Sequence, residues 1–296
     1  MTQQTKSKRA LVFVNRQARQ GGDKINEALE QLENLGFDLL EKKIKNADQI
    51  PGVIRSNQDK VDLVIIGGGD GTMNAAVEGL VETQLPLGIL PLGTANDLAR
   101  TLGIPTTLPE ACQVIASGKM QRIDLGWVNG KYFFNVASLG LSVKITRQLT
   151  KDIKQKWGVL AYAITASKAV WESRPFNASI RINGEEPILV RALQIAVGNG
   201  RYYGGGMTVA EDAAIDDRRL DLYSLEAKDW WHILALMPAM RQGNHASWPG
   251  VRAFQGQEIE ITTYSKKRPI NTDGEITTTT PATFRVIPQA LPVYVP

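Results

Sequence analysis

Apolar and polar residues form alternating blocks along the first part of the chain, in the order strand, helix, strand, helix. The expected strands cover residues 10–14, 37–41, 61–66 and 87–90, and the expected helices cover residues 23–35, 48–57, 72–83 and 95–103. In the first helix, Ile25, Leu29 and Leu32 recur on one face. The uninterrupted apolar run at 61–66 is typical of a parallel strand that is buried on both faces. This order predicts an α/β domain with a mainly parallel sheet.

The pattern changes near residue 125, where short strands replace the alternation of strands and helices. The pair Asn129-Gly130 predicts a tight hairpin, and two helix-like stretches follow over about 142–155 and 158–173. The later apolar segments are short and are separated by Gly, Pro and Asn, which is the spacing of an antiparallel sandwich or barrel. We therefore expect two domains, with a boundary near residue 127.

Composition agrees with a folded protein, because 43% of the 296 residues are hydrophobic and 22% are charged. The net charge of +4 suits an anionic ligand or a membrane surface, although many soluble proteins have a similar charge. The single cysteine, Cys112, excludes an internal disulfide and indicates a reducing cytoplasm, and its apolar neighbours indicate core packing. Apolar stretches stay shorter than the ~18 residues of a transmembrane helix, so any lipid is expected to be reached from the water side.

A glycine-rich segment follows the most buried strand. The strand runs into Gly67, Gly68, Gly69, Asp70, Gly71 and Thr72, and a helix pattern begins there. Glycines between a strand and a helix let backbone N–H groups approach an anion, at the edge where open α/β sheets bind ligands. A tight turn alone would need fewer glycines, so we favour a phosphate site. Asp70 would repel phosphate, and we therefore expect Mg²⁺, water or a substrate hydroxyl beside it.

A second turn of the same kind follows the next strand, in Gly93-Thr94-Ala95-Asn96-Asp97. Asn96 or Asp97 could simply cap a helix, but two such turns after consecutive strands meet at the same sheet edge. Three common nucleotide motifs are excluded: Thr72 occupies the third glycine position of G-x-G-x-x-G, and neither a P-loop nor an H-R-D catalytic loop is present. His232 and His245 have no metal-ligand spacing, and no basic-aromatic pattern indicates nucleic acid.

Together, GGGDGTMN (67–74) and PLGTANDLAR (91–100) resemble the soluble bacterial diacylglycerol kinase and lipid kinase family, whose catalytic domain is shared with eukaryotic diacylglycerol, ceramide and sphingosine kinases. The G-G-D-G-T core alone is also similar to NAD kinases, and the Asn-Asp pair of the second motif favours lipid kinases. Three later segments extend the resemblance over nearly the whole chain. IDDRRLDLYSL (215–225) resembles a D-D-G-x-L-D-L segment, INTDGE (270–275) a D-G-E motif, and FRVIPQALPVYVP (284–296) a closing segment that returns to the first domain.

The resemblance implies a fold and a set of site residues. It implies an NAD-kinase-like nucleotide-binding α/β domain over 1–127, rejoined by 286–296, and a β-rich sandwich for lipid and metal over 128–285. It implies that ATP phosphates are bound by Asn15, Gly67, Gly68, Gly69, Asp70, Gly71, Thr72 and Thr94, and that Asn96 and Asp97 lie toward the substrate. It assigns a structural Mg²⁺ to Asp217 and the backbone carbonyls of Ala214 and Arg219. It places Asp70, Asp273 and Glu275 in catalysis, with Glu275 as proton acceptor.

The expected activity is ATP-dependent phosphorylation of diacylglycerol or a related lipid alcohol, giving phosphatidic acid or an analogue for phospholipid metabolism. The expected partners are ATP and a lipid at the inner face of the membrane, a homodimer is compatible with the sequence, and nucleic acid is not expected. A kinase of the NAD-kinase type and a non-catalytic nucleotide-binding regulator are the alternatives. Four features depart from the family pattern. Arg16 replaces proline and Arg19 replaces glycine in the loop after Asn15, and Arg218 replaces the glycine of D-D-G. The threonine that usually follows the second strand is not evident in EKKIKNADQ.

Overall fold

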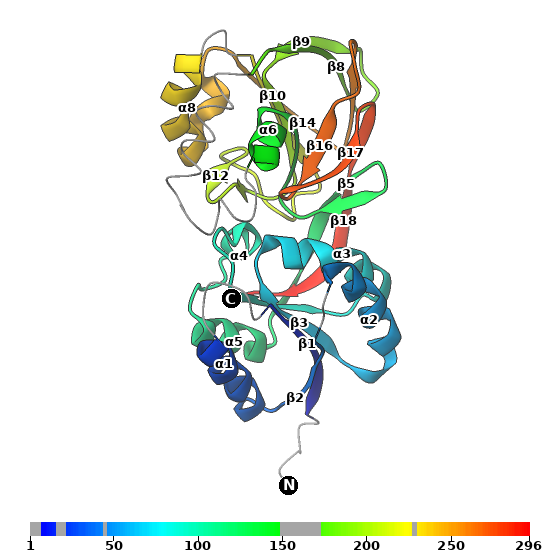
Figure 1. The fold of residues 1–296 in the computed structure, drawn as a ribbon, viewed down its shortest axis with the longest axis vertical. Helices are drawn as coiled ribbons and strands as arrows, with labels where there is room; N and C mark the ends of the chain where they lie inside the picture. The colour runs from blue at the N-terminus through cyan, green and yellow to red at the C-terminus, as the bar shows by residue number, and fades with distance from the viewer. Residues whose placement is uncertain (1–6, 16–21, 44–45, 149–172, 227–229) are drawn as a thin grey trace. The chain divides into compact units, whose positions relative to one another are not determined.

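The computed structural model describes residues 7–15, 22–43, 46–148, 173–226 and 230–296. The chain forms two compact units (Figure 1). Unit 1 comprises Met1–Asp124 and Pro288–Pro296, and unit 2 comprises Leu125–Ile287. The chain passes between the units through β5 (Met120–Val128) and through the long strand β18 (Ala282–Tyr294). Each unit has its own sheet arrangement.

Unit 1 is an α/β layer built on a parallel sheet, as the sequence predicts. Its strands lie in the order β2-β1-β3-β4, and the end of β18 pairs in parallel with β4. The strands are β1 (Lys8–Val14), β2 (Phe37–Glu41), β3 (Leu63–Gly68) and β4 (Leu87–Pro91). The helices are α1 (Gly22–Asn34), α2 (Ile50–Asn57), α3 (Asp70–Thr83), α4 (Asp97–Thr101) and α5 (Leu108–Ser117). Every residue of β3 and β4 is buried, which explains why their sequences are continuously apolar.

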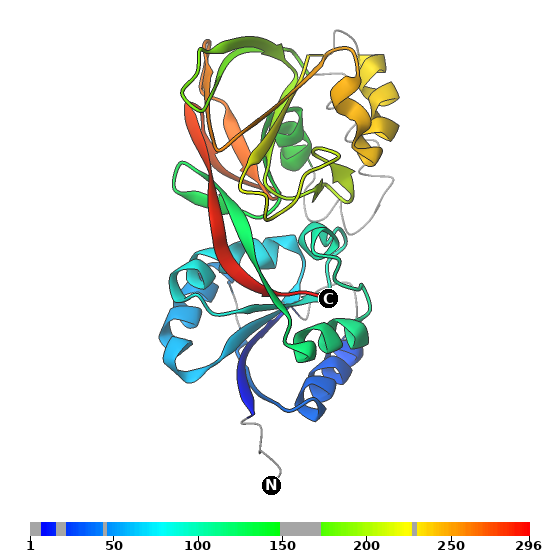
Figure 2. The ribbon, with the colours of Figure 1, turned by 180° about the vertical axis from the view of Figure 1, so that it is seen from behind.

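Helices cover both faces of the sheet in unit 1. Helices α1 and α5 pack together on one side, and α2 and α3 pack together on the other (Figure 1; Figure 2). The predicted face of α1 is confirmed in part, since Ile25, Ala28 and Leu32 are buried. Cys112 on α5 is fully buried, as expected, and burial raises the pKa of its thiol to about 11. The thiol is therefore protonated and packed, with Sγ 3.5 Å from the carbonyl oxygen of Ala28.

Unit 2 is a sandwich of antiparallel strands, which confirms the predicted β-rich domain. One layer has the order β18-β15-β8-β9, and the other has the order β14-β13-β10-β7-β16-β17. The first layer contains β8 (Phe176–Ile182), β9 (Ile188–Ala192) and β15 (Glu258–Thr263). The second contains β7 (Val136–Gly140), β10 (Gln194–Gly198), β13 (Leu220–Leu225), β14 (Val251–Gly256), β16 (Pro269–Thr272) and β17 (Glu275–Thr279). Leu139 and Ile195 of one layer share a buried core with Ile261 and Phe284 of the other.

Shorter elements complete unit 2. They are β6 (Lys131–Phe133), β11 (Tyr202–Tyr203), β12 (Met207–Thr208), α6 (Leu141–Gln148), α8 (Trp230–Gln242) and the 3₁₀ turn η3 (Asn244–Ser247). The helix expected over 142–155 is present as α6 up to Gln148. The remainder of that stretch, and the helix expected over 158–173, lie outside the described residues. The predicted hairpin is confirmed, since Asn129 (φ 47°) and Gly130 (φ 90°) form the left-handed turn between β5 and β6.

Candidate active site

The glycine segment after β3 forms a turn of a single residue. Gly67 and Gly68 belong to the strand and α3 begins at Asp70, so only Gly69 lies between the two elements. A Cβ on Gly68 would lie 2.6 Å from Oγ1 of Thr72, and the missing side chain therefore lets the first turn of the helix fold back on the strand. The 14-residue helix α3 thus begins directly at the carboxyl edge of the sheet. Its first N–H groups and its dipole favour an anion at this edge.

The turns after β3 and β4 lie against each other, as the sequence predicts. A Cβ on Gly93 would lie 2.5 Å from Cα of Gly69, which is closer than any side chain allows. The N–H of Leu92 donates to the carbonyl oxygen of Gly68 at 3.0 Å and fastens the second turn to the first. Glycine is required at both positions because the two backbones meet there.

Two polar side chains fix the second turn. Asn96 adopts a left-handed conformation with φ 50°. Its Oδ1 accepts from the N–H of Gly93 at 2.8 Å, and its Nδ2 donates to the carbonyl oxygen of Gly93 at 2.9 Å. Oδ1 of Asp70 accepts from the N–H of Leu98 at 3.1 Å, which joins the start of α3 to the start of α4. Asn96 and Asp70 therefore position the turns as well as being candidates for ligand contact.

The other residues assigned to ATP lie at the same edge of the sheet. Gly71 and Thr94 are exposed, and Thr72 is half-buried in the first turn of α3. Asn15 is exposed at the end of β1, and its N–H donates to the carbonyl oxygen of Gly67 at 2.8 Å. Asp97 is buried at the first position of α4. Unit 1 thus brings all the predicted phosphate-binding residues to the ends of β1, β3 and β4.

Arg16 and Arg19, the two departures after Asn15, lie outside the described residues.

The turn between β16 and β17 contains the two acids assigned to catalysis in unit 2. Asp273 and Gly274 have positive φ angles of 47° and 97°, and Glu275 is the exposed first residue of β17. Oδ2 of Asp273 accepts from the N–H of Phe134 at 2.6 Å, and its Oδ1 accepts from the N–H groups of Asn135 and Val136 at 3.0 Å each. The carboxylate of Asp273 therefore holds the loop before β7. The arrangement favours a positioning role for Asp273 and leaves Glu275 as the acid that projects from the turn.

The loop before β13 contains the residues assigned to Mg²⁺. Oδ2 of Asp217 accepts from the N–H of Ala214 and its Oδ1 accepts from the N–H of Arg219, each at 3.2 Å. Arg218 has a φ angle of 62°, so the loop keeps the left-handed conformation that glycine would adopt without strain. Among the described residues no group of three His, Cys, Asp or Glu side chains could hold a metal. One carboxylate with backbone carbonyl oxygens, as the sequence expectation has it, is oxygen chemistry of the kind that Mg²⁺ uses.

The side chain of Arg219 has a role that the sequence did not reveal. Its guanidinium lies 2.8 Å from Oδ2 of Asp212, 3.2 Å from Oδ2 of Asp217 and 3.6 Å from Oδ1 of Asp221. Burial raises the pKa of Asp221 to about 6, and the charge of Arg219 opposes this shift. The hydrogen bond from Arg219 lowers the pKa of Asp212. In the sequence, the position of Asp221 inside the apolar strand LDLYSL could have indicated a buried ion pair.

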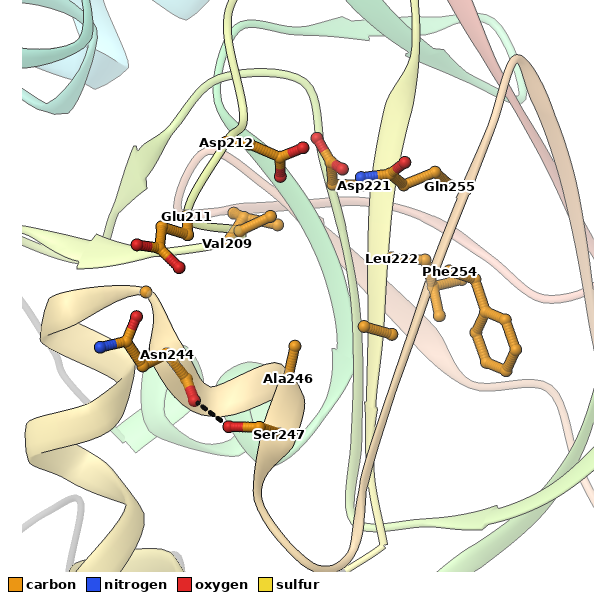
Figure 3. A pocket seen from close by; sticks show the side chains of 13 residues that line it. Val209, Glu211, Asp212, Asp221, Leu222, Asn244, Ala246, Ser247, Phe254 and Gln255 are labelled. Carbon is orange, nitrogen blue, oxygen red and sulfur yellow. Dashed lines mark hydrogen bonds between the residues drawn. The ribbon is translucent and has the colours of Figure 1, made fainter.

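A pocket of about 550 Å³ lies beside this loop, within unit 2 (Figure 3). Asp212 and Asp221 approach each other at one end of it, and Ala246 and Ser247 line the opposite end (Figure 3). Oγ of Ser247 donates to the carbonyl oxygen of Asn244 at 3.0 Å, which closes the 3₁₀ turn η3 along this wall. None of the residues assigned to phosphate, metal or catalysis lines the pocket.

The parallel sheet with paired glycine turns, followed by an antiparallel sandwich, defines a kinase fold, and comparison with known proteins identifies the family. Residues 9–128 match the family described as the diacylglycerol kinase catalytic domain, and residues 135–295 match the YegS C-terminal NAD kinase beta sandwich-like domain. The second match covers more than half of the chain. This chain belongs to the diacylglycerol kinase and YegS-like lipid kinase family.

Individual relatives support the same assignment. A Shewanella frigidimarina protein named "Probable lipid kinase YegS-like" is 30% identical, over 85% of this chain and 82% of its own. A Staphylococcus saprophyticus protein named "Diacylglycerol kinase" is 28% identical, over 91% of this chain and 89% of its own. The crystal structure of a diacylglycerol kinase from Bacillus anthracis superposes with a TM-score of 0.81, at 24% identity over 98% of this chain and 97% of that one, which shows that the two chains share a fold.

Within the described residues, no helix combines the length and apolar character needed to cross a bilayer.

Proposed function

We propose that the protein transfers the γ-phosphate of ATP to the hydroxyl of diacylglycerol, or of a closely related lipid alcohol, and releases phosphatidic acid or its analogue. The name of one relative, "Diacylglycerol kinase", supports this acceptor, and the name of another, "Probable lipid kinase YegS-like", supports a lipid kinase. The observation that carries the proposal is the contact of the two glycine turns at Gly69 and Gly93, at the N-terminus of α3. Such a backbone surface favours a phosphate chain.

In this proposal, residues of unit 1 bind the phosphates of ATP. Backbone N–H groups around Gly69, Gly71 and Thr72 would bind phosphate oxygens, with the hydroxyl of Thr94 and the side chain of Asn15 beside them. Asn96 would hold the second turn in the geometry that these contacts need. Phosphoryl transfer requires positioning and charge neutralisation more than covalent chemistry from the protein, and a fixed backbone surface supplies positioning.

In this proposal, residues of unit 2 act on the hydroxyl of the lipid acceptor. Glu275 would accept the proton of the lipid hydroxyl as its oxygen bonds to the γ-phosphorus, while the bond from phosphorus to the bridging oxygen breaks and ADP leaves. Asp273 would hold the turn that carries Glu275 through its three backbone contacts. Glu275 is exposed, as a base that must meet a substrate has to be.

Mg²⁺ is the proposed cofactor. Bound Mg²⁺ neutralises phosphate charge and orders carboxylates. Asp217, with the carbonyl oxygens of Ala214 and Arg219, would hold a structural ion, and Asp70 would face the ion that accompanies ATP. Asp70 keeps its Leu98 contact through one oxygen, which leaves its other oxygen available for this role.

A phosphorylation assay with labelled ATP and Mg²⁺ tests the proposal. The purified chain is offered diacylglycerol, monoacylglycerol and ceramide in mixed micelles, and NAD in solution. We expect labelled phosphatidic acid as the main product, and its loss in Glu275→Gln at unchanged thermal stability. Formation of NADP would instead support a kinase of the NAD-kinase type. ATP binding without turnover on any of the alcohols would support a non-catalytic regulator.

A further inference from the structure

Asn271 of β16 lies two residues before Asp273, and its side chain points away from the core of the sandwich. The preceding residue, Ile270, belongs to that core, and alternate residues of a strand point to opposite faces. Asn271 pairs with Ser138 of β7 across the sheet, so the two side chains share a face. Asn271 and Ser138 are each 5% exposed, so another element has to cover them.

Helix α6 covers this part of the sheet (Figure 1). Oγ of Ser142 donates to Oγ of Ser138 at 2.8 Å. Nδ2 of Asn271 donates to Oγ1 of Thr146 at 2.6 Å. Residues four positions apart lie on one face of a helix, so the two hydroxyl groups of α6 face the sheet together. The helix is therefore held on β7 and β16 by one polar contact to each strand.

The oxygen of the same amide holds the turn between β16 and β17. Oδ1 of Asn271 accepts from the N–H of Gly274 at 2.7 Å. Asp273 and Gly274 both have left-handed φ angles, so the chain reverses sharply at this point. Glu275 is the next residue, and the bond to Gly274 therefore sets the direction of the chain one residue before the acid.

The pairing of β16 with β17 is irregular beside Asn271. Asn271 pairs with Ile276, whereas the residue before it pairs with Thr278. Thr277 is therefore an extra residue in β17, which makes a β-bulge. Bulges change the direction of nearby side chains and are frequent next to active sites. The strand ladder is thus interrupted close to the turn, and the contacts of the turn itself have to fix its direction.

We propose that Asn271 is a positioning residue for Glu275, and that it holds the turn of Glu275 against α6. The inference rests on the proposed function, in which Glu275 accepts the proton of the acceptor hydroxyl. A base has to be aligned with the proton that it accepts, and an exposed glutamate on a turn is aligned only as well as the turn is held. One amide supplies a donor and an acceptor in a single plane, so Asn271 can bond to Thr146 and to Gly274 at once.

Steady-state kinetics of the full chain, with diacylglycerol in mixed micelles, test the proposal. Asn271→Ala should lower kcat by about 10-fold or more and change the KM for ATP by less than about 2-fold, because it disturbs the base and leaves the phosphate site of unit 1 intact. Asn183→Ala is the matched control. Oδ1 of Asn183 accepts from the N–H groups of Gln257 and Glu258 at 2.9 and 3.1 Å, elsewhere in unit 2. The control should melt at a lower temperature and keep the wild-type kcat.

Two further comparisons separate positioning from a merely structural role. Thr146→Val removes the hydroxyl that accepts from Asn271 and should lower kcat by about 3-fold or more, whereas Thr146→Ser keeps a hydroxyl and should restore it. In the Glu275→Gln background, Asn271→Ala should lower the residual turnover by less than about 2-fold, because no base is left to position. If Asn271→Ala does not fold, Thr146→Val in the same background makes this comparison.

Amide hydrogen exchange reports on the turn directly. Gly274 is exposed, so its N–H should exchange about 10-fold faster in Asn271→Ala than in wild type, and at the wild-type rate in Asn183→Ala. The inference is overturned if the exchange of Gly274 is unchanged, or if Asn271→Ala lowers turnover equally with and without Glu275. Wild type that phosphorylates no lipid alcohol would refute the proposed function and this inference with it, whereas active wild type with a normal kcat in Asn271→Ala would refute the inference alone.

Discussion

Oδ1 of Asp70 lies 3.1 Å from the backbone nitrogen of Leu98, so the acid of the first glycine turn is also the anchor of the second. Asp70→Asn keeps an oxygen at this position and should leave the free energy of unfolding almost unchanged. Turnover should nevertheless fall by about 10² or more if the charge of Asp70 meets Mg²⁺. Asp70→Ala should lose about 1–2 kcal/mol of stability as well, because it also removes the bond to Leu98. Near-normal turnover in Asp70→Asn would refute the metal role.

The contact of the two glycine turns predicts a steric effect on nucleotide binding. Gly93→Ala places a Cβ 2.5 Å from Cα of Gly69 and has to push the turns apart. We expect ATP affinity to fall by at least about 10-fold, measured by titration calorimetry. Gly52→Ala is the control, since its Cβ meets nothing within 4 Å and alanine favours the helix α2. The control should bind ATP normally and be slightly more stable.

The two acids of the β16–β17 turn should behave differently. Asp273→Ala leaves the N–H groups of Phe134, Asn135 and Val136 without their acceptor, so unfolding should become easier by about 3 kcal/mol. Glu275→Gln should lower kcat by roughly 10² to 10⁴ at an unchanged melting temperature. Chemical denaturation and steady-state kinetics measure the two quantities. Equal profiles for both variants would contradict this division of roles.

The guanidinium of Arg219, 3.2 Å from Asp217, should oppose a cation at the same carboxylate. Arg219→Met should therefore lower the melting temperature in EDTA, corresponding to about 2 kcal/mol, because three aspartates lose a shared positive charge. Added Mg²⁺ should restore more stability than in wild type, with an affinity at least about fivefold higher. Thermal melts over a Mg²⁺ series measure both effects. Asp217→Ala should abolish the response, and Arg218→Gly, which relieves a left-handed arginine, should keep it.

His245 should make unit 2 sensitive to acid. The side chain is 1% exposed, with its ring 5.0 Å from that of Tyr223, and burial lowers its pKa while the backbone of Val209 opposes the shift. The unfolded chain therefore binds the proton more readily, so stability is lost as pH falls below about 6.5. The loss at pH 5 reaches at most about 2 kcal/mol, if the native imidazole stays neutral. His245→Phe should flatten the slope of unfolding free energy between pH 7 and pH 5, and an unchanged slope would exclude His245 as its source.

Local sequence patterns predicted the parts of the fold that depend on local chemistry. The strand at 37–41 and the Asn129-Gly130 turn follow from periodicity and turn preference, and both are present as expected. The helix expected over 95–103 is shorter, because Asn96 closes a turn on Gly93 and delays the helix to Asp97. A side chain that bonds to the backbone in place of a helical hydrogen bond leaves no trace in the pattern of apolar residues, so this shortening could not be predicted from that pattern.

Long-range contacts explain most of what the sequence did not predict. Asp273 bonds to residues more than 130 positions away, so its structural role was hidden in a motif that suggested catalysis. Arg219 was expected to contribute its carbonyl group, and its side chain proved to join three aspartates. The domain boundary, expected near residue 127 from the change of pattern, lies within β5, and the two compact units divide between Asp124 and Leu125. These contacts form between residues that are far apart in the sequence, so local sequence patterns do not reveal them.

The strand β18 has a consequence for how the protein is made. Unit 1 receives its final strand segment only after the ribosome has added the 163 residues of unit 2, from 125 to 287. At a synthesis rate of 5–20 residues per second, this interval lasts roughly 8–30 s. During that time the apolar strand β4 has an open edge where Val293 later pairs with Leu87. An unpaired hydrophobic edge is a site where nascent chains can associate, so we expect misassembly to be most frequent in the interval before the last strand arrives.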